Sequence, residues 1–362
     1  MAGHPYASIP PYASWRRAFE RVPMAEVDPV ARFPFKVAPQ DKVATAGSCF
    51  AQHIARRLRA GGFTYFVTEP GHPLLDEKLR TEFGYGVFSA RYGNIYTTRQ
   101  LRQLFDRCYG HFVPAEDVWR RGDRYLDPFR PTIQPDGFAS EEEFRADRAQ
   151  HLAAVRRMFE ELDVFVFTLG LAEGFVSRQD GAAFPVCPGV AGGEFDPERH
   201  VFVNERVDEV IGNLAVFIAS LRRVNPRARV ILTVSPVPLK ATAEDRHVLQ
   251  STVYSKSVLR VAAQEICDTH EDVAYFPSYE IITGAYTRGA YFAADLREVE
   301  EAGVEHVMRL FFRHATRPGP AAGAPAPAAA EPPPAARHLA RARAAAALIC
   351  DEELLDIPPA AL

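Results

Sequence analysis

A serine and a cysteine stand side by side in the stretch VATAGSCFAQHIARRLRAGG, residues 43–62. Small apolar residues come first, and apolar residues then recur at helical spacing, which predicts a strand, a tight turn and a helix. Ser48 would lie just before the helix N-terminus, where backbone N–H groups and the helix dipole favour a developing negative charge. A serine nucleophile needs such a position, and a simple N-cap serine also occupies it.

Cys49, the next residue, is interpreted as a packing residue, because free cysteines are usually buried and inert. The five cysteines are scattered, odd in number and without CxxC spacing. This pattern argues against a disulfide framework and a zinc site, and it favours reduced thiols in a cytoplasm. The sequence also has no HExxH motif and no phosphate-binding glycine loop, so we expect no metal and no cofactor.

Other polar residues follow the runs that would form further strands. Ligands of an open parallel sheet bind at the carboxyl ends of its strands. Gly170 and Glu173 follow one such run, and His247 lies in the loop after another. The pair Gly93-Asn94 could offer a backbone N–H and an amide to an oxyanion, although a plain turn fits it equally well.

The elements that must position these residues alternate along the chain. Short apolar runs predict strands, most of them buried, at residues 42–46, 62–67, 163–169, 229–237 and 273–276. Amphipathic patterns predict helices near residues 52–60, 98–108, 152–162, 207–221, 258–266 and 296–312. Strands that alternate with helices imply right-handed crossovers and a three-layer α/β sandwich with a mostly parallel central sheet.

Composition divides the chain into further parts. Residues 1–40 are expected to form an extended N-terminal arm, and residues 41–315 the α/β domain, with an irregular insertion at 69–140 rich in Gly, Pro and aromatic residues. Residues 316–337 consist mainly of Pro, Ala and Gly, which predicts a disordered linker. Residues 338–362 then predict a short Ala-rich helix and a tail.

Length, charge and hydropathy exclude several classes of protein. The chain has 362 residues, of which 47% are hydrophobic and 24% charged, as in soluble globular proteins. The net charge is −4 and no long basic run occurs, so nucleic-acid binding is not expected. No stretch approaches 18 apolar residues and the N-terminus lacks a signal-peptide pattern, so we expect no membrane span and a cytoplasmic location. These features leave the oligomeric state open.

Several motifs together resemble a known family. AGSCFAQHIARRL resembles the signature of the GSCFA family, and four later stretches are similar to other family blocks: YGNIYTTRQL, FTLGLAE, TVSPVPL and YFPSYEI. They occur in order across roughly residues 40–312. The family resembles a branch of the SGNH (GDSL-type) hydrolases, in which the serine of the first block is the nucleophile. The resemblance therefore implies an SGNH-hydrolase-like fold with Ser48 as nucleophile and Cys49 as a packing residue.

The chain also departs from the SGNH pattern. The last SGNH block reads Asp-x-x-His, whereas here Asp295 is followed by Glu298 in the histidine position. Ala172 stands where an asparagine usually completes the oxyanion hole, and it has no side-chain donor. The general base is therefore open between Glu298 and a loop histidine. His247 is the first candidate and His111 and His200 are others, while His306 is expected to be a helix-face residue.

The resemblance implies a serine-dependent esterase or acyltransferase that acts on an O-acyl ester of a small molecule or a glycan. Ser48 would attack the acyl carbon, the N–H groups of Ser48 and Gly93 would hold the oxyanion, and Asp295 would orient the base. Arg297 would either pair with Asp295 or bind a carboxylate or phosphate. The alternatives are a catalytically silent protein that binds a glycan or a protein in the cleft, and a structural protein tethered by its tail.

Overall fold

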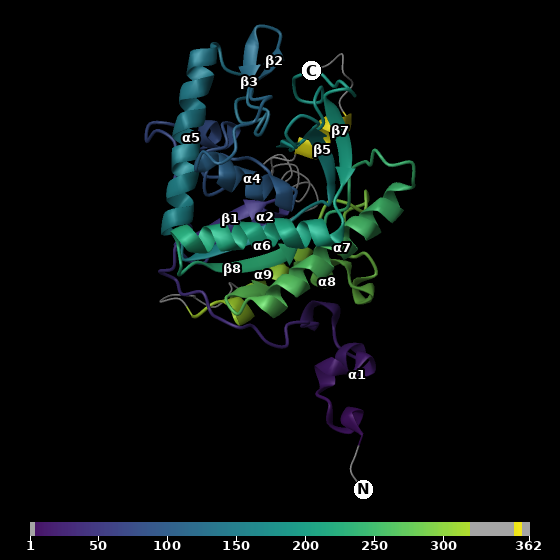
Figure 1. Cartoon of the computed structure of the whole chain (residues 1–362). Coiled ribbons are helices and arrows are strands. Elements are labelled where there is room, and N and C mark those ends of the chain that lie inside the picture. The colour runs from purple at the N-terminus through teal and green to yellow at the C-terminus, as the bar shows by residue number, and fades with distance from the viewer. Residues whose placement is uncertain (1–3, 319–350, 357–362) are drawn as a thin grey trace, which may run out of the picture.

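The computed structural model describes residues 4–318 and 351–356. At the centre of these residues is a parallel four-stranded sheet, shown in Figure 1. Its strands run in the order β1 (Val43–Gly47), β4 (Val164–Leu169), β8 (Arg229–Val234) and β9 (Val273–Tyr275). Every residue of β1 and β4 is buried, which explains why these strands are continuous apolar runs rather than alternating patterns.

Helices cover both faces of the sheet. One face packs against α4 (Thr98–Cys108), α5 (Glu141–Glu161), α6 (Val207–Val224) and α7 (Val248–Thr269). The opposite face packs against α2 (Phe50–Ala60), α8 (Ser278–Thr283) and α9 (Glu301–Ala315). Alternate residues of β4 enter opposite cores, as the pleat of a strand requires: Phe165 and Phe167 enter the first, and Val164 and Val166 the second. The predicted three-layer α/β sandwich with a mostly parallel sheet is confirmed.

Smaller elements surround this sandwich. An antiparallel sheet in the order β6-β5-β7 and a hairpin of β2 and β3 lie beyond the central sheet. The remaining elements are η1 (Pro5–Ser8), η2 (Pro11–Ala13), α1 (Trp15–Phe19), η3 (Met24–Glu26), α3 (Glu77–Glu82), β2 (Trp119–Arg121), β3 (Arg124–Leu126), β5 (Glu173–Ser177), β6 (Ala183–Phe184), β7 (His200–Asn204), η4 (Ala285–Thr287) and η5 (Asp351–Asp356).

Three expectations about local structure need correction or lie outside the described residues. Residues 62–67 form no strand, because only Tyr65 makes an isolated bridge to Val43. The last helix begins at Glu301 rather than near residue 296, since Leu296 adopts φ 57° in a turn. The predicted linker beyond Pro318 and the Ala-rich stretch up to residue 349 lie outside the described residues.

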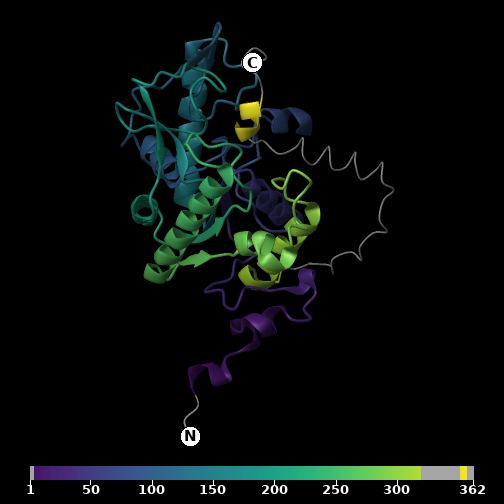
Figure 2. The ribbon, with the colours of Figure 1, turned by 90° about the vertical axis from the view of Figure 1, so that its right-hand side faces the viewer.

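The N-terminal arm points away from the body over its first part, as Figures 1 and 2 show. The first of its residues to be buried are Val27, Val30 and Val37, and His306 of α9 bonds the Val27 carbonyl through Nε2 at 2.9 Å. Across residues 4–318 and 351–356, no helix combines the length and apolar character that a membrane crossing requires.

A buried cluster of charged residues holds the insertion at residues 69–140 against α5. Arg91 donates from its backbone N–H to Glu69 (2.8 Å) and from Nη1 to Asp147 (2.8 Å). Arg130 donates from Nε to Asp127 (2.8 Å). The side chains of Arg91 and Arg130 are both only 2% exposed. Because Arg91 directly precedes residues 92–96, this cluster fixes a segment that the site below depends on.

Asp127 balances the positive charge of this cluster. Burial alone would raise the pKa of Asp127, but the guanidinium groups of Arg148, Arg130 and Arg107 outweigh burial and hold the pKa far below its ordinary value. The carboxylate therefore stabilises the fold at all pH values above its ordinary pKa, and this contribution is lost as pH falls below that range.

We therefore predict that Asp127→Asn lowers the free energy of unfolding by about 3–5 kcal/mol, because it leaves buried guanidinium groups uncompensated. Urea denaturation at neutral pH measures this loss. Asp123→Asn is the matched control, since Asp123 has a side chain 94% exposed, and its effect should stay within about 0.5 kcal/mol. Equal effects of the two substitutions would contradict the role given to Asp127.

Candidate active site

The turn after β1 depends on a close backbone approach. Gly47 has φ +136°, and a Cβ atom added there would lie 2.3 Å from the carbonyl oxygen of Thr168 in β4. Only glycine fits such a position. The Gly47 carbonyl accepts the N–H of Ile95 (2.9 Å), and the Ser48 N–H donates to the Thr168 carbonyl (3.3 Å). The turn is therefore fixed between residues 94–96 and the end of β4.

Ser48 lies in this turn with a buried, unpaired hydroxyl. Its side chain is 4% exposed, and Oγ has no hydrogen-bond partner within the described residues. The N-cap of α2 is Cys49, which makes no side-chain capping bond, so the N-cap interpretation of Ser48 is wrong. A buried hydroxyl without a partner costs stability, and such groups call for an explanation such as a catalytic role. Cys49 itself is buried, as expected of a packing residue.

The start of the β4–β5 connection faces Ser48 from the other side. The N–H groups of Gly170 and Leu171 donate to the carbonyl of Tyr96 (3.0 and 2.9 Å). A Cβ atom at Gly170 would lie 3.2 Å from Ser48 Cβ and 3.1 Å from the Tyr96 carbonyl oxygen. Gly170, predicted as a binding residue, therefore sits directly against the Ser48 side chain.

Lys256 of α7 contacts Gly170, the residue that lies against Ser48. Its side chain is buried, and Nζ donates to the Gly170 carbonyl at 2.7 Å. Burial lowers the pKa of Lys256 to about 8, with Glu352 and Cys49 opposing the shift and Arg297 adding to it. A buried amine that is partly neutral near physiological pH can accept a proton.

The sequence reasoning did not single out Lys256. A usable signal was present, because Lys256, Leu259 and Ala263 lie three and four residues apart and therefore share one helix face. A lysine on an inward face is rarely buried without a reason.

Two backbone donors near Ser48 are already engaged. The Ala172 N–H donates to Ser255 Oγ (2.8 Å), and the Ser48 N–H donates to Thr168 as described above. The Ser48 N–H therefore takes part in the link between β1 and β4, and its expected role in an oxyanion site stays a prediction. Gly93, the other expected donor, has φ 69°, a conformation that suits glycine.

Glu173 begins β5 with a nearly buried carboxyl group. Thr242 Oγ1 donates to Glu173 Oε2 at 3.1 Å. Burial raises the pKa of Glu173 to about 7, supported by Glu244 and Glu352 and opposed by the bond from Thr242. Glu173 is thus a second group near the site that can exchange a proton at neutral pH.

The residues of the last SGNH-like block lie in an exposed turn. Asp295 and Glu298 are both exposed. Asp295 Oδ1 accepts the N–H groups of Arg297 and Glu298, both at 3.0 Å, and thereby caps its own turn. The Arg297 side chain of this block reaches the carboxylates of Glu352 and Glu353 in η5.

The candidate histidines lie in other environments. His247 is the exposed N-cap of α7, and its Nδ1 accepts the Leu249 N–H at 3.1 Å. It precedes Lys256 by nine residues, which is ~13 Å along a helix axis. His306 is buried in α9 and bonds Tyr291 (2.8 Å), His200 bonds Glu116 (2.9 Å), and His111 stacks on Tyr109.

The short helix η5 near the C-terminus contacts the predicted binding residue Asn94. Asn94 Nδ2 donates to Asp351 Oδ2 (2.9 Å), and Thr132 Oγ1 donates to Asp351 Oδ1 (2.6 Å). The Asp351 N–H donates to Tyr96 Oη at 3.2 Å. Asp351 is 2% exposed, so its carboxylate is held by neutral donors inside the protein.

The next residues of η5 pair with cations. Arg297 Nη2 bonds Glu352 at 2.8 Å and Nη1 bonds Glu353. Lys240 bonds Glu353 at 3.0 Å and Asp356 at 2.5 Å. Arg297, a predicted carboxylate-binding residue, therefore contacts two carboxylates of the same chain.

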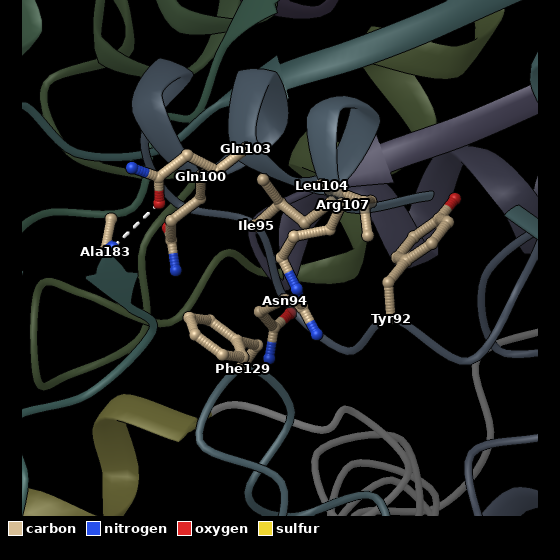
Figure 3. A pocket seen from close by; sticks show the side chains of 9 residues that line it. All are labelled: Tyr92, Asn94, Ile95, Gln100, Gln103, Leu104, Arg107, Phe129 and Ala183. Carbon is tan, nitrogen blue, oxygen red and sulfur yellow. Dashed lines mark hydrogen bonds between the residues drawn. The ribbon is translucent and has the colours of Figure 1, made fainter. Parts of the chain in front are cut away.

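A small cavity lies on another side of Asn94, between α4 and the insertion. Asn94, Gln100, Gln103, Arg107 and Phe129 are among the residues that line it, as Figure 3 shows. Its space of about 20 Å³ is enough for about one water molecule, not for a substrate. Among the described residues, no group of three or more His, Cys, Asp and Glu side chains could hold a metal ion.

Together these features define a three-layer α/β protein with a buried serine next to Gly170, whose carbonyl binds a buried lysine, at the carboxyl end of a parallel sheet. The model of the GSCFA family matches residues 42–311, and the chain belongs to this family. No curated protein matches the sequence.

Three solved structures illustrate weaker similarity. A protein described as a "putative platelet activating factor" from Streptococcus pneumonia has a TM-score of 0.26 and 15% identity over 46% of this chain and 64% of its own. A carbohydrate esterase family 3 protein from Talaromyces cellulolyticus has a TM-score of 0.27 and 14% sequence identity over 59% of this chain and 87% of its own. A mutant acetyl esterase with an acetate ion has a TM-score of 0.26 and 11% sequence identity over 58% of this chain and 86% of its own. The chain covers less than two thirds of the first of these, and similarity of this size carries no conclusion about activity.

The close approach at Gly47 gives a test of the turn. We predict that Gly47→Ala lowers the free energy of unfolding by about 2–4 kcal/mol, because backbone strain and overpacking each cost about 1–3 kcal/mol. Gly212→Ala in α6 is the matched control, since a Cβ there meets no atom within 4 Å. It should raise stability by about 0.5–1 kcal/mol through helix propensity. Chemical denaturation measures both, and a stable Gly47→Ala protein would contradict the geometry.

Proposed function

We propose that the protein is a serine-dependent esterase or acyltransferase that acts on an O-acyl ester, with Ser48 as nucleophile and Lys256 as general base. The observation that carries the proposal is the buried, unpaired Ser48 Oγ next to Gly170, whose carbonyl binds the Lys256 amine at 2.7 Å. Serine and lysine form such a pair in known variants of the catalytic triad. Membership of the GSCFA family, with its resemblance to the SGNH hydrolases, supports the reaction class.

In the proposed reaction, Ser48 Oγ attacks the acyl carbonyl carbon while the neutral Lys256 amine accepts the hydroxyl proton. The ester C–O bond then breaks, and the ammonium returns the proton to the leaving alkoxide, which departs as an alcohol. Water, or a second alcohol in an acyltransferase, attacks the acyl-enzyme with the amine again as base. Lys256 is favoured over His247 and Glu298, because these two lie in surface turns and it is buried against Gly170.

We predict that Ser48→Ala abolishes labelling by a fluorophosphonate probe and turnover of a chromogenic acetyl ester. Ser278→Ala is the matched control, since Ser278 is another fully buried serine whose Oγ has no partner within the described residues. It should leave labelling and turnover intact. Probe labelling that survives Ser48→Ala, or is absent from the wild-type chain, would contradict the proposal.

Substitution of Lys256 separates base catalysis from charge. We predict that both Lys256→Met and Lys256→Arg reduce turnover by about 10²–10⁴-fold, because a guanidinium keeps the charge but does not act as a base. Lys78→Met, at an exposed position of α3, should have no effect. Full activity of Lys256→Arg would rule out proton transfer by Lys256.

The pH dependence identifies the base. Since only the neutral amine accepts a proton, kcat/KM should rise with pH through about 8, the lowered pKa of Lys256, and fall below it. A rise centred near 7 would instead assign the base to Glu173, whose pKa is about 7. In that case Glu173→Gln, and not Lys256→Met, should remove the pH-dependent limb.

A second candidate function is non-catalytic binding of a ligand next to Ser48. Two observations favour it: Ala172 offers no side-chain amide and its N–H is engaged by Ser255, and Glu298 replaces the expected histidine in a surface turn. A binding protein would show no turnover and no labelling at Ser48, and Ser48→Ala would bind a glycan or protein ligand as tightly as the wild-type chain does.

A further inference from the structure

The C-terminal helix η5 is held by residues from four separate parts of the chain. Asn94 and Tyr96, Thr132, Lys240 and Arg297 all contact its residues, and every one of these contacts is polar. Helix η5 is short and its sequence, DEELLD, contains four carboxylates. Figure 2 shows it as a short yellow helix against the body of the protein. Leu354 adds an apolar contact with the cluster that contains Trp119, Leu126 and Phe184, so charge and hydrogen bonding act together with one apolar side chain to hold η5.

Two of the interactions of η5 lead to Gly170, the residue that lies against Ser48. Tyr96, whose Oη accepts the Asp351 N–H, also accepts the Gly170 N–H through its carbonyl. Glu352 acts on the pKa of Lys256, which binds Gly170 from the other side. Helix η5 is therefore linked to Gly170 through Tyr96 and through Lys256.

Docking of η5 also takes two carboxylates out of water. Burial raises the pKa of both Asp351 and Glu352, against the opposing effects of Thr132 and Asn94 on the first and of Arg297 and Lys256 on the second. Both carboxylates lose solvation when the helix docks, and water would restore it on release.

We propose that the surface formed by Asn94, Tyr96, Thr132, Lys240 and Arg297 is a binding site for an acidic peptide segment, and that residues 351–356 of the same chain are its ligand. Asn94 and Thr132 bind the first carboxylate, and Lys240 and Arg297 bind those that follow. The protein then has a closed state with η5 docked and an open state with η5 released. This proposal does not depend on Ser48 being a nucleophile, because it concerns binding alone.

The test uses the full-length chain with Asp351→Asn, Glu352→Gln and Glu353→Gln, called the neutralised chain. An amine-reactive acetylating reagent followed by mass spectrometry measures the reactivity of Lys240, which η5 binds in the closed state. We expect reactivity of Lys240 to rise by about tenfold, since each lost charge-assisted bond weakens docking severalfold. Lys78, exposed on α3, should react equally in both chains.

A matched control chain removes three exposed carboxylates elsewhere, with the substitutions Asp123→Asn, Glu142→Gln and Glu271→Gln. It should react like the wild-type chain. The single variant Glu353→Lys alters an exposed position, so it tests docking without disturbing a buried group. It should raise the reactivity of Lys240 as well, because the new ammonium repels both Lys240 and Arg297.

A peptide in trans completes the test. N-acetylated DEELLD amide, which retains the first N–H, should restore protection of Lys240 in the neutralised chain at millimolar concentration, the range of effective concentrations for a tethered segment. NQQLLN amide should not. Unchanged reactivity of Lys240 in the neutralised chain, or equal protection by both peptides, would overturn the proposal. Protection in the wild-type chain that fades on dilution would also overturn it, because the ligand would then come from a second copy.

Discussion

The hydrogen bonds between the turn after β1 and its two neighbours determine how the candidate site is built. Gly47 approaches the Thr168 carbonyl so closely that a side chain cannot be accommodated, and its own carbonyl accepts the Ile95 N–H. These contacts place Ser48 next to Gly170, where a Cβ atom on Gly170 would lie 3.2 Å from Ser48 Cβ. The position of Ser48 therefore follows from the main chain, and residues 94–96 are as necessary to it as the central sheet.

Residues 94–96 belong to an insertion that has little regular structure near the site. A cluster of buried charged residues, rather than a strand, holds this segment in place. Arg91 and Arg130 are held by Glu69, Asp127 and Asp147. Such a cluster stabilises less than an apolar core of the same size would, because each charge loses its hydration on burial. It is directional, however, and directional bonds can fix the angle of the loop that presents Asn94 and Tyr96.

The sequence predicts the central sheet well because its strands are continuous apolar runs that only burial on both faces explains. The helix at residues 98–108 coincides with α4, since Thr97 and Gln100 form a capping box that fixes its start. Periodicity could not reveal the sheet of β5, β6 and β7, because β6 has only two residues and β5 and β7 have five each. The sequence does not predict a role for Lys256, because the buried face of its helix is recognised from apolar residues alone.

Sequence reasoning also could not anticipate the contacts of η5, since Asn94 and its partner Asp351 are 257 positions apart in the chain. The contacts of η5 with Asn94 and Arg297 nevertheless agree with the sequence-based expectation that these two side chains bind negative charge. Ester hydrolysis creates an oxyanion in its transition state and releases a carboxylic acid. A site whose donors are arranged for developing negative charge will therefore also bind carboxylates.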